Sequence, residues 1–277
     1  YYAWRYTTSI AYRENGGNQI YHGLQLESRR RLKNGISYQL GYVWSKNISD
    51  VLDQDDNDAK GQSTDANNRA LDRGRVQYNR AHNFTFFAIW ELPLGRGHRL
   101  LGNAPAWVHH TVSGWEFYPE LFVGSGTWFT PYRSGRNPFT NADGASQTAR
   151  ADRIGNGNDG PRLTGVDTRK WFNIEAFADP PANRLGTAGR NILEGPGFWH
   201  ASASLTKKIR FRENKQLWLT VAAMNLFNHP NFRSPNTTAE LTVGQAAFGS
   251  TVGLLTTDRA ADRSRARVIW LRARLMF

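Results

Sequence analysis

The chain has 277 residues, a net charge of +12, no cysteine and ten tryptophans. The lack of cysteine excludes disulfides, thiolate-bound zinc and cysteine nucleophiles. No stretch approaches the roughly 18 consecutive apolar residues that a membrane-spanning helix needs. The positive charge has three interpretations: binding of nucleic acid, a lumen lined with arginine, and attraction to anionic surface lipids. Composition does not choose among them. The arginines are dispersed along the chain, which disfavours a nucleic-acid patch.

Seven segments alternate apolar and polar residues with the two-residue period of a β-strand. Ile36–Ser45 is the clearest, because every even-numbered position from Ile36 to Trp44 is apolar. In Leu217–Phe227 both faces are apolar, and we assign the face that contains Leu217 to the same side as the apolar faces of the other strands. An eighth, weaker strand is predicted in Tyr1–Arg13. In chain order the seven segments are Ile20–Leu32, Ile36–Ser45, His82–Leu92, Trp115–Ser125, Trp199–Ile209, Leu217–Phe227 and Arg267–Phe277.

The connections between these segments alternate between short and long. Lys33–Asn34 and Phe211–Asn214 are short, and Pro93–Thr111 is intermediate. The long polar connections are Lys46–Ala81, Phe129–Phe198 and Asn228–Ala266. Short periplasmic turns and long extracellular loops are typical of outer-membrane barrels, whereas compact soluble domains rarely contain such loops. The sequence therefore predicts an all-β fold, an antiparallel transmembrane β-barrel. Here it would be a partial barrel of about 7–8 strands, forming an open, strongly curved sheet with long extracellular loops.

Aromatic residues fall at both ends of the predicted lipid-facing side. If the final strand ends in the periplasm, two belts follow, with Trp90 and Trp115 near the periplasm and Trp44 and Trp199 near the outside. Interfacial tryptophans of this kind are expected at both membrane surfaces. Trp218 and Trp270 are exceptions, because the alternation turns them inward.

The last segment, Arg267–Phe277, presents an uninterrupted apolar face that includes Leu271, Leu275 and Phe277. Two arginines, Arg272 and Arg274, occupy the opposite face. A strand between lipid and a wet lumen requires this two-sided pattern.

Several motifs resemble, in the same order, those of the Oar-like TonB-dependent receptors of the bacterial outer membrane. They are the run Leu24–Asp50, Arg80–Phe84, Glu91–Gly97, Trp171–Asn173 with Ala176–Phe177, Gly189–Phe198, Asn225–Phe232 and the terminal strand. The resemblance covers nearly the whole chain. It implies that residues 1–277 form the C-terminal part of a plugged barrel of about 22 strands. The plug, the TonB-contacting segment, any N-terminal module and the signal peptide are expected upstream.

The resemblance also implies the activity and the partners. The full-length protein would import an unidentified solute with energy from the TonB complex, which it contacts through its N-terminal part. The barrel-assembly machinery would recognise the final strand through Phe277, Leu275 and Leu271. Outer-membrane lipid and lipopolysaccharide are further expected partners, and nucleic acid is not.

No catalytic or cofactor site is predicted. Gly155–Gly160 has the spacing of a dinucleotide-binding loop, but Pro161 and polar residues follow where a helix would have to begin. Asp53–Asp58 lacks the glycine and the glutamate of a calcium-binding loop. His109 and His110 are adjacent and do not form a metal motif. We therefore expect no enzymatic activity, no cofactor and no metal.

Four residues near the start of the second long connection suit the capture of a carbohydrate or an anionic ligand, although ordinary loop packing is the favoured interpretation. They are Trp128, Tyr132, Arg133 and Arg136. The charged residues of the inner face are interpreted as the solvated lining of a wet lumen.

Two alternative functions stay open. An outer-membrane adhesion or secretion-associated barrel without energised uptake shares every strand signal. A soluble, basic all-β binding protein would instead pack its apolar faces inside. In that case Tyr38, Leu40, Phe86, Leu121 and Leu271 would lie together in the interior of two packed layers.

Overall fold

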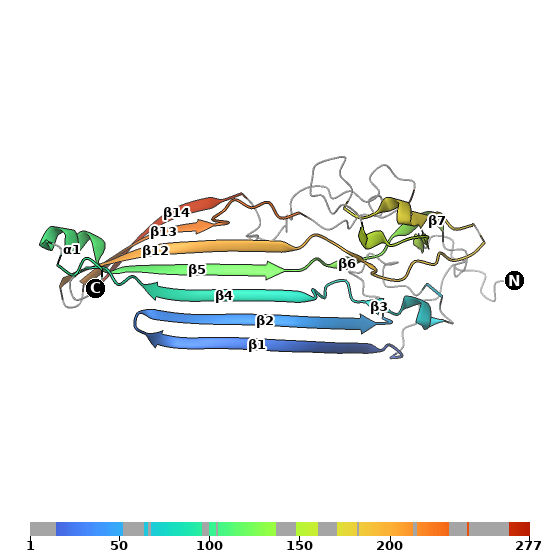
Figure 1. Ribbon diagram of the computed structural model, residues 1–277, viewed down its shortest axis with the longest axis horizontal. Helices are drawn as coiled ribbons and strands as arrows, with labels where there is room; N and C mark the ends of the chain where they lie inside the picture. Colours follow the sequence, from blue (N-terminus) through green and yellow to red (C-terminus); the bar gives the residue numbers. More distant parts are fainter. Residues whose placement is uncertain are drawn as a thin grey trace, which may run out of the picture.

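Seven long antiparallel strands form one sheet, in which each strand pairs with its neighbours in chain order (Figure 1). They are β1 (Gln19–Lys33), β2 (Ile36–Ser49), β4 (His82–Glu91), β5 (Trp115–Gly124), β12 (Phe198–Arg212), β13 (Lys215–Met224) and β14 (Val268–Met276). A short strand, β3 (Gly74–Arg75), pairs with the end of β2. All seven predicted strands are thus confirmed.

The computed structural model describes residues 15–51, 64–65, 68–95, 100–103, 105–136, 148–159, 171–181, 183–212, 215–232, 243 and 266–277, without the side chains of 134–136, 148 and 212. The weaker strand predicted in Tyr1–Arg13 lies outside the described residues. No helix in the described ranges has the length and the apolar composition to cross a membrane.

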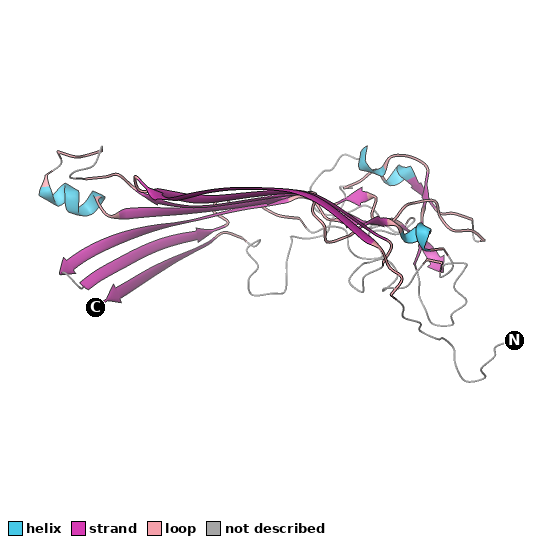
Figure 2. Cartoon of the chain, turned by 90° about the horizontal axis from the view of Figure 1, so that it is seen from below, coloured by secondary structure: helices cyan, strands magenta, loops and turns pink. Residues whose placement is uncertain are grey.

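The sheet is open. Its two edges are β1 and β14, and each of them pairs with a single long strand in the described part of the chain. Seen edge-on, the sheet is curved, and the strand that ends at the C-terminus lies well below the stacked strands (Figure 2). The prediction of an open, partial barrel is confirmed.

The strand register joins the predicted apolar faces into one continuous surface. Residues directly opposite each other in an antiparallel pair point to the same side. Leu40 lies opposite Phe86, Phe86 opposite Leu121, and Leu121 opposite Ala201. The ambiguous strand follows the assigned phase, because Val221 of β13 lies between Leu205 and Leu271.

No second layer covers this apolar surface in the described residues. Leu271 is 78% exposed, Trp44 is 53% exposed and Leu26 is 52% exposed. A soluble sandwich would bury such residues between two sheets about 10 Å apart. In the part of the chain that the structure describes, the interior arrangement expected for a soluble protein is therefore not found, and the apolar surface is left open on one side of the sheet.

The turn between β1 and β2 is made by Asn34 and Gly35, both with positive φ, at 56° and 75°. Lys33 pairs with Ile36 on either side of it. A two-residue Asn-Gly turn of this kind matches the twist of a β-hairpin. The Lys33–Asn34 turn predicted from the sequence therefore lies one residue further along.

We expect Gly35→Val to destabilise this hairpin by about 1–2 kcal/mol, because a β-branched residue is strained at positive φ. A Cβ at this position would also lie 3.0 Å from the carbonyl oxygen of Glu91. The free energy of unfolding from phospholipid vesicles measures the change. Asn34→Gly is the matched control and should change stability little, so an equal loss in both variants would contradict the turn geometry.

The intermediate connection contains a helix that the sequence did not predict, α1 (Ala106–Val112). Lys207 lies opposite Trp115 on the apolar side of the sheet, and its Nζ donates to the carbonyl oxygens of His110 at 2.9 Å, Thr111 at 3.1 Å and Ser113. Carbonyls at a helix C-terminus lack intrahelical partners and favour a nearby cation. The helix end therefore accounts for a lysine on the apolar side. A helix of seven residues is too short to show a clear period in the sequence.

The described parts of the first and second long connections lie at the end of the sheet opposite to α1 and the C-terminus (Figure 1). The described residues between 128 and 194, mostly from the second connection, form what we call the loop unit. It contains β6 (Trp128–Phe129), β7 (Tyr132–Arg136), β8 (Thr148–Arg150), β9 (Asp152–Arg153), η3 (Gly157–Asp159), η4 (Ile174–Ala176), β10 (Phe177–Ala178) and β11 (Leu193–Glu194). In addition, η2 (Arg69–Asp72) lies in the first long connection.

The loop unit has a hydrophobic core of its own, made of Phe129, Tyr132, Ala151, Trp171, Phe172, Ala176, Phe177, Ala188 and Leu193. In the sequence this connection is only a long polar stretch, which does not predict a core. Strands of two or three residues are too short to show an alternating pattern, and the aromatic residues are scattered among polar ones. Apolar burial therefore gives the loop unit a defined shape above one end of the barrel wall.

Candidate functional site

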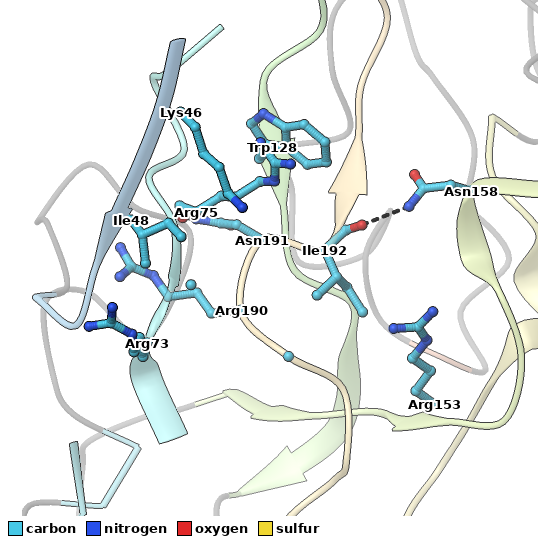
Figure 3. Close-up of a pocket in the computed structure, with 12 residues that line it drawn as sticks. Lys46, Ile48, Arg73, Arg75, Trp128, Arg153, Asn158, Arg190, Asn191 and Ile192 are labelled. Atoms are coloured by element: carbon cyan, nitrogen blue, oxygen red, sulfur yellow. Dashed lines mark hydrogen bonds between the residues drawn. The ribbon is translucent and has the colours of Figure 1, made fainter. Parts of the chain in front are cut away.

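A cavity of about 560 Å³ lies between the outer end of β2 and the loop unit (Figure 3). We call it the basic pocket. It is lined by Lys46 and Ile48 of β2, residues 73–75 around β3, Trp128 of β6, Arg153 of β9, Asn158 of η3, and residues 189–192 ahead of β11. Its residues therefore come from five separate parts of the sequence.

The lining carries five cationic side chains and no carboxylate, the cations being Lys46, Arg73, Arg75, Arg153 and Arg190. Arg190 differs from the other four because it is fully buried, whereas the others are exposed or half-buried. Arg190 is buried, and its Nη1 donates to the carbonyl oxygens of Ser49 at 3.2 Å and Asp72 at 3.3 Å. Arg190 thus ties the loop unit to β2 and η2, and its role is structural.

Asn191 fixes the floor of the basic pocket. It is buried and adopts a positive φ of 50°, which asparagine tolerates better than most residues. Its backbone N–H donates to Thr130 Oγ1 at 2.9 Å, and its Nδ2 donates to the carbonyl oxygen of Arg75 at 2.7 Å. Next to it, a Cβ on Gly74 would come within 2.5 Å of the carbonyl oxygen of Arg190. Only glycine permits this close approach of β3 to the loop unit.

Two Asp-Arg dipeptides divide their charges between the interior and the pocket. Asp72 and Asp152 are buried, while the next residues, Arg73 and Arg153, are exposed and line the pocket. Each aspartate is bonded elsewhere, since Arg150 Nη2 lies 2.7 Å from Asp72 Oδ1 and Arg184 Nη1 lies 2.7 Å from Asp152 Oδ1. The carboxylates nearest to the pocket in sequence therefore do not neutralise it.

The hydrogen bond from Arg184 is the main cause that holds the pKa of Asp152 below its ordinary value of 3.8, and the backbone N–H of Thr187 adds to it. A carboxyl group with a depressed folded-state pKa stabilises the fold fully above its unfolded pKa, and this stabilisation is lost as the pH falls through the folded value. The contacts of Asp152 should therefore hold the loop unit at neutral pH and release it in acid.

We expect hydrogen exchange at residues 183–190, relative to a reference peptide from β5, to rise as the pH falls below about 3.8. Asp152→Asn should raise the exchange of this segment at neutral pH and remove most of its pH dependence. Asp159→Asn, an exposed aspartate of the same loop unit, is the control. An unchanged pH profile in Asp152→Asn would show that this carboxylate is not responsible.

The four ligand-loop candidates fall in different places. Trp128 lines the basic pocket, with the guanidinium carbon of Arg75 3.9 Å from its ring centroid. Tyr132 is 2% exposed in the core of the loop unit, which is the packing role that the sequence favoured. Arg133 donates to the carbonyl oxygen of Pro181 at 3.3 Å. Arg136 ends β7, and its side chain lies outside the described residues.

The tryptophans of the two predicted belts lie at opposite ends of the apolar face. Trp44 and Trp199 lie toward the long connections, opposite His82 and Val123 respectively. At the other end, Trp90 pairs with Ile36 and Trp115 with Lys207. Their role as lipid-interface anchors stays a prediction, as does recognition of Leu271, Leu275 and Phe277 by the assembly machinery. Those three side chains are all more than half exposed on the apolar side.

The inner face of the sheet carries most of the charged and hydroxyl side chains of the strands, together with an aromatic pair of Phe87 and Phe122. Lys208 Nζ lies 2.5 Å from Glu116 Oε1, and the Tyr118 hydroxyl donates to the same carboxylate. Thr206 and Thr220 share a hydrogen bond of 2.9 Å across β12 and β13. Lys208 Nζ lies 4.5 Å from the ring centroid of Trp218, which faces inward, so this exception to the belts has a polar partner. The inner face is therefore suited to contact with water.

The motif Asn225–Phe232 has a structural role. Asn225 follows β13 and has a φ of 49°; its Oδ1 accepts from the backbone N–H of His229, and its Nδ2 donates to the carbonyl oxygen of His229. The ring of His229 stacks on that of Trp199, with the ring centroids 4.3 Å apart. Asn231 Oδ1 accepts from the backbone N–H of Trp199, and Asn231 Nδ2 donates to the carbonyl oxygen of Trp199. Trp199 is thus partly covered by this turn.

Sequence reasoning missed most of the basic pocket, including Arg73, Arg75 and Arg153. No local signal identifies them, because dispersed arginines look alike until the loop unit brings some of them together. The dipeptides Asp72-Arg73 and Asp152-Arg153 are the only trace in the sequence, and such pairs are common. Among the described residues, no group of three His, Cys, Asp or Glu side chains is arranged to hold a metal ion.

A family model described as "Outer membrane beta barrel domain" matches residues 1–268. The chain belongs to this family. Its location is therefore the bacterial outer membrane, and the soluble alternative is set aside. Neither the curated proteins nor the solved structures contain a match to the chain.

Proposed function

We propose that this outer-membrane barrel is the C-terminal part of an Oar-like TonB-dependent receptor that takes up an unidentified solute. The observation that carries the proposal is the mainly polar inner face, which extends over seven long strands without β1 meeting β14. A wall of this kind suits a wide barrel with a wet or plugged lumen rather than a small closed one. The ordered motifs that resemble the Oar-like receptors support the same assignment.

In this proposal the chain has a structural role in uptake. The strands form part of the wall of the lumen, and charged inner side chains such as Lys208 and Glu116 contact water or the plug. The loop unit lies over the outer mouth and restricts access to it. The final strand carries the signal for the barrel-assembly machinery. The chain contributes no catalytic step and needs no cofactor.

The loop unit is firmly joined to the strands that would carry it. The backbone N–H of Ser125 donates to the carbonyl oxygen of His82. In the same way, the N–H of Trp128 donates to the carbonyl oxygen of Gln77, and the N–H of Gly195 to that of Thr127. The first bond joins the ends of β4 and β5, the second joins β6 to the segment ahead of β4, and the third joins the two segments that flank the loop unit. A ligand that moves the loop unit would therefore act directly on the barrel wall.

The test uses the protein expressed from its complete gene and purified in detergent. We expect it to bind the purified periplasmic domain of TonB in a pull-down, while an outer-membrane barrel without a plug, used as the control, does not. Lack of binding, together with a complete gene that encodes no plug, would instead support the adhesion or secretion-associated barrel.

A further inference from the structure

We propose that the basic pocket binds phosphate groups, and that their source is the phosphorylated headgroup of an outer-leaflet glycolipid. This inference goes beyond solute uptake, because it concerns a contact between the protein and its membrane. It does not depend on coupling to TonB.

The charges of the pocket point to an anion. Lys46, Arg73, Arg75 and Arg153 line one cavity, and no carboxylate of the described residues lies within ion-pair distance of their charged groups. Like charges held together destabilise a fold unless an opposite charge is supplied. Because Asp72 and Asp152 are bonded to Arg150 and Arg184, they leave these four cations available to an anionic ligand.

The carboxylates are directed away from the pocket by specific bonds. Asp72 is bonded to Arg150 and Asp152 to Arg184, as described above. Asp50, the third acidic residue near this end of β2, accepts hydrogen bonds from the backbone N–H of Asn18 at 2.6 Å and from its Nδ2 at 3.1 Å. Asp50 also interacts electrostatically with Arg73, so Lys46, Arg75 and Arg153 are the cations left for an anion.

The geometry favours phosphate. The guanidinium carbon of Arg75 lies over the Trp128 ring, 3.9 Å from its centroid, and a cation–π contact holds a guanidinium in place while its N–H groups remain able to donate. Guanidinium groups bind phosphate oxygens through paired, charge-assisted hydrogen bonds. Arg153 lies across the cavity from Trp128, beyond Asn191 and Ile192 (Figure 3). A ligand that carries more than one phosphate group can therefore contact cations on both sides.

The depth of the pocket favours a lipid source over a free solute. Lys46 and Ile48 continue the outward face of β2 beyond Trp44, the last exposed tryptophan on that strand. Two residues of a strand advance about 7 Å. The headgroup layer of one leaflet is about 5–8 Å thick, as the difference between the hydrocarbon core and the whole bilayer indicates. If Trp44 marks the interface, Lys46 lies at the level of the lipid phosphates.

The experiment compares lipopolysaccharide bound to the complete protein, purified from outer membranes, in the wild type and in Lys46→Gln/Arg153→Gln. Both side chains are exposed, so their loss should leave the fold intact. We expect the affinity for lipopolysaccharide, titrated into delipidated protein, to fall about tenfold or more, because each charge-assisted bond contributes about that factor. Arg75→Gln is a second variant with the same expected direction.

Arg267→Gln is the matched control, because Arg267 is an exposed arginine at the same end of the sheet and does not line the pocket. Inorganic tripolyphosphate is titrated in parallel to distinguish the two sources. Pocket variants that weaken lipopolysaccharide binding support the lipid headgroup. Variants that weaken only tripolyphosphate binding would support a phosphate site for a soluble ligand and overturn the lipid source.

Two results would overturn the site itself. One is a wild-type protein that binds neither probe, and the other is binding that the pocket variants and Arg267→Gln reduce equally. Neither result affects the TonB pull-down, and a failed pull-down leaves phosphate binding unchanged. The two proposals are therefore tested separately.

Discussion

Leu40→Arg should lower the free energy of unfolding from phospholipid vesicles by about 2–4 kcal/mol, the effect of a cation facing lipid near the bilayer midplane. Leu40 lies on the apolar face between Ser28 and Phe86, well inside β2. No second layer of described residues covers this face, so an arginine there has hydrocarbon as its neighbour. The measurement is a guanidinium titration of the protein expressed from its complete gene.

Gln39→Arg is the matched control, one residue away and on the inner face. Gln39 is exposed, and its Nε2 lies 3.3 Å from Glu27 Oε1, so an arginine there has water and a carboxylate within reach. We expect a change below about 1 kcal/mol, as for other exposed ion pairs. Equal decreases in the free energy of unfolding for the two variants would contradict the conclusion that one face of the sheet contacts lipid and the other contacts water.

Asp72→Asn should destabilise the loop unit locally by about 3–5 kcal/mol, because it leaves the buried guanidinium of Arg150 without its counter-charge. The side chains of Asp72 and Arg150 are 1% and 7% exposed, and the pair joins η2 to β8. Arg150 Nη1 also donates to the carbonyl oxygen of Leu71. Hydrogen exchange of residues 68–75 and 148–153 measures the change, with β5 and β12 as internal references.

The double variant Asp72→Asn/Arg150→Met separates the charge effect from the loss of shape. Removing both charges avoids an unpaired buried cation, so the double variant should be more stable than Asp72→Asn alone. Destabilisation that simply adds in the double variant would show that the pair is not coupled. Because Arg73 follows Asp72, the single variant should also disturb the basic pocket.

The barrel strands could be predicted from the sequence because alternation is a local property. The alternation within each strand indicates which of its sides faces lipid. The register of β2, β4, β5 and β12 then places these sides on one face of the sheet. Even in Leu217–Phe227, where both faces are apolar, the phase assigned from the sequence agrees with the pairing of Val221 between Leu205 and Leu271.

The loop unit and α1 could not be predicted in the same way. The strands β6 and β11 contain two residues each, too few for a period, and their pairing depends on a contact between residues 128–129 and 193–194. Tyr132 illustrates the difficulty, since an aromatic residue in a polar loop suits ligand contact and core packing equally well. Only the assembled core places it at 2% exposure.

The amino-acid sequence by itself determined the two-sided strands, their order and the class of membrane they cross, because these follow from side-chain alternation and from loop lengths. Tertiary structure alone decided where the charges of the loops lie. Lys46, Arg75 and Arg153 share one cavity because Asn191 and Arg190 bind the loop unit to β2 and β3, while Asp72 and Asp152 are bonded elsewhere. The physical reason is that alternation acts between neighbours, whereas a pocket requires residues brought together from distant parts of the chain.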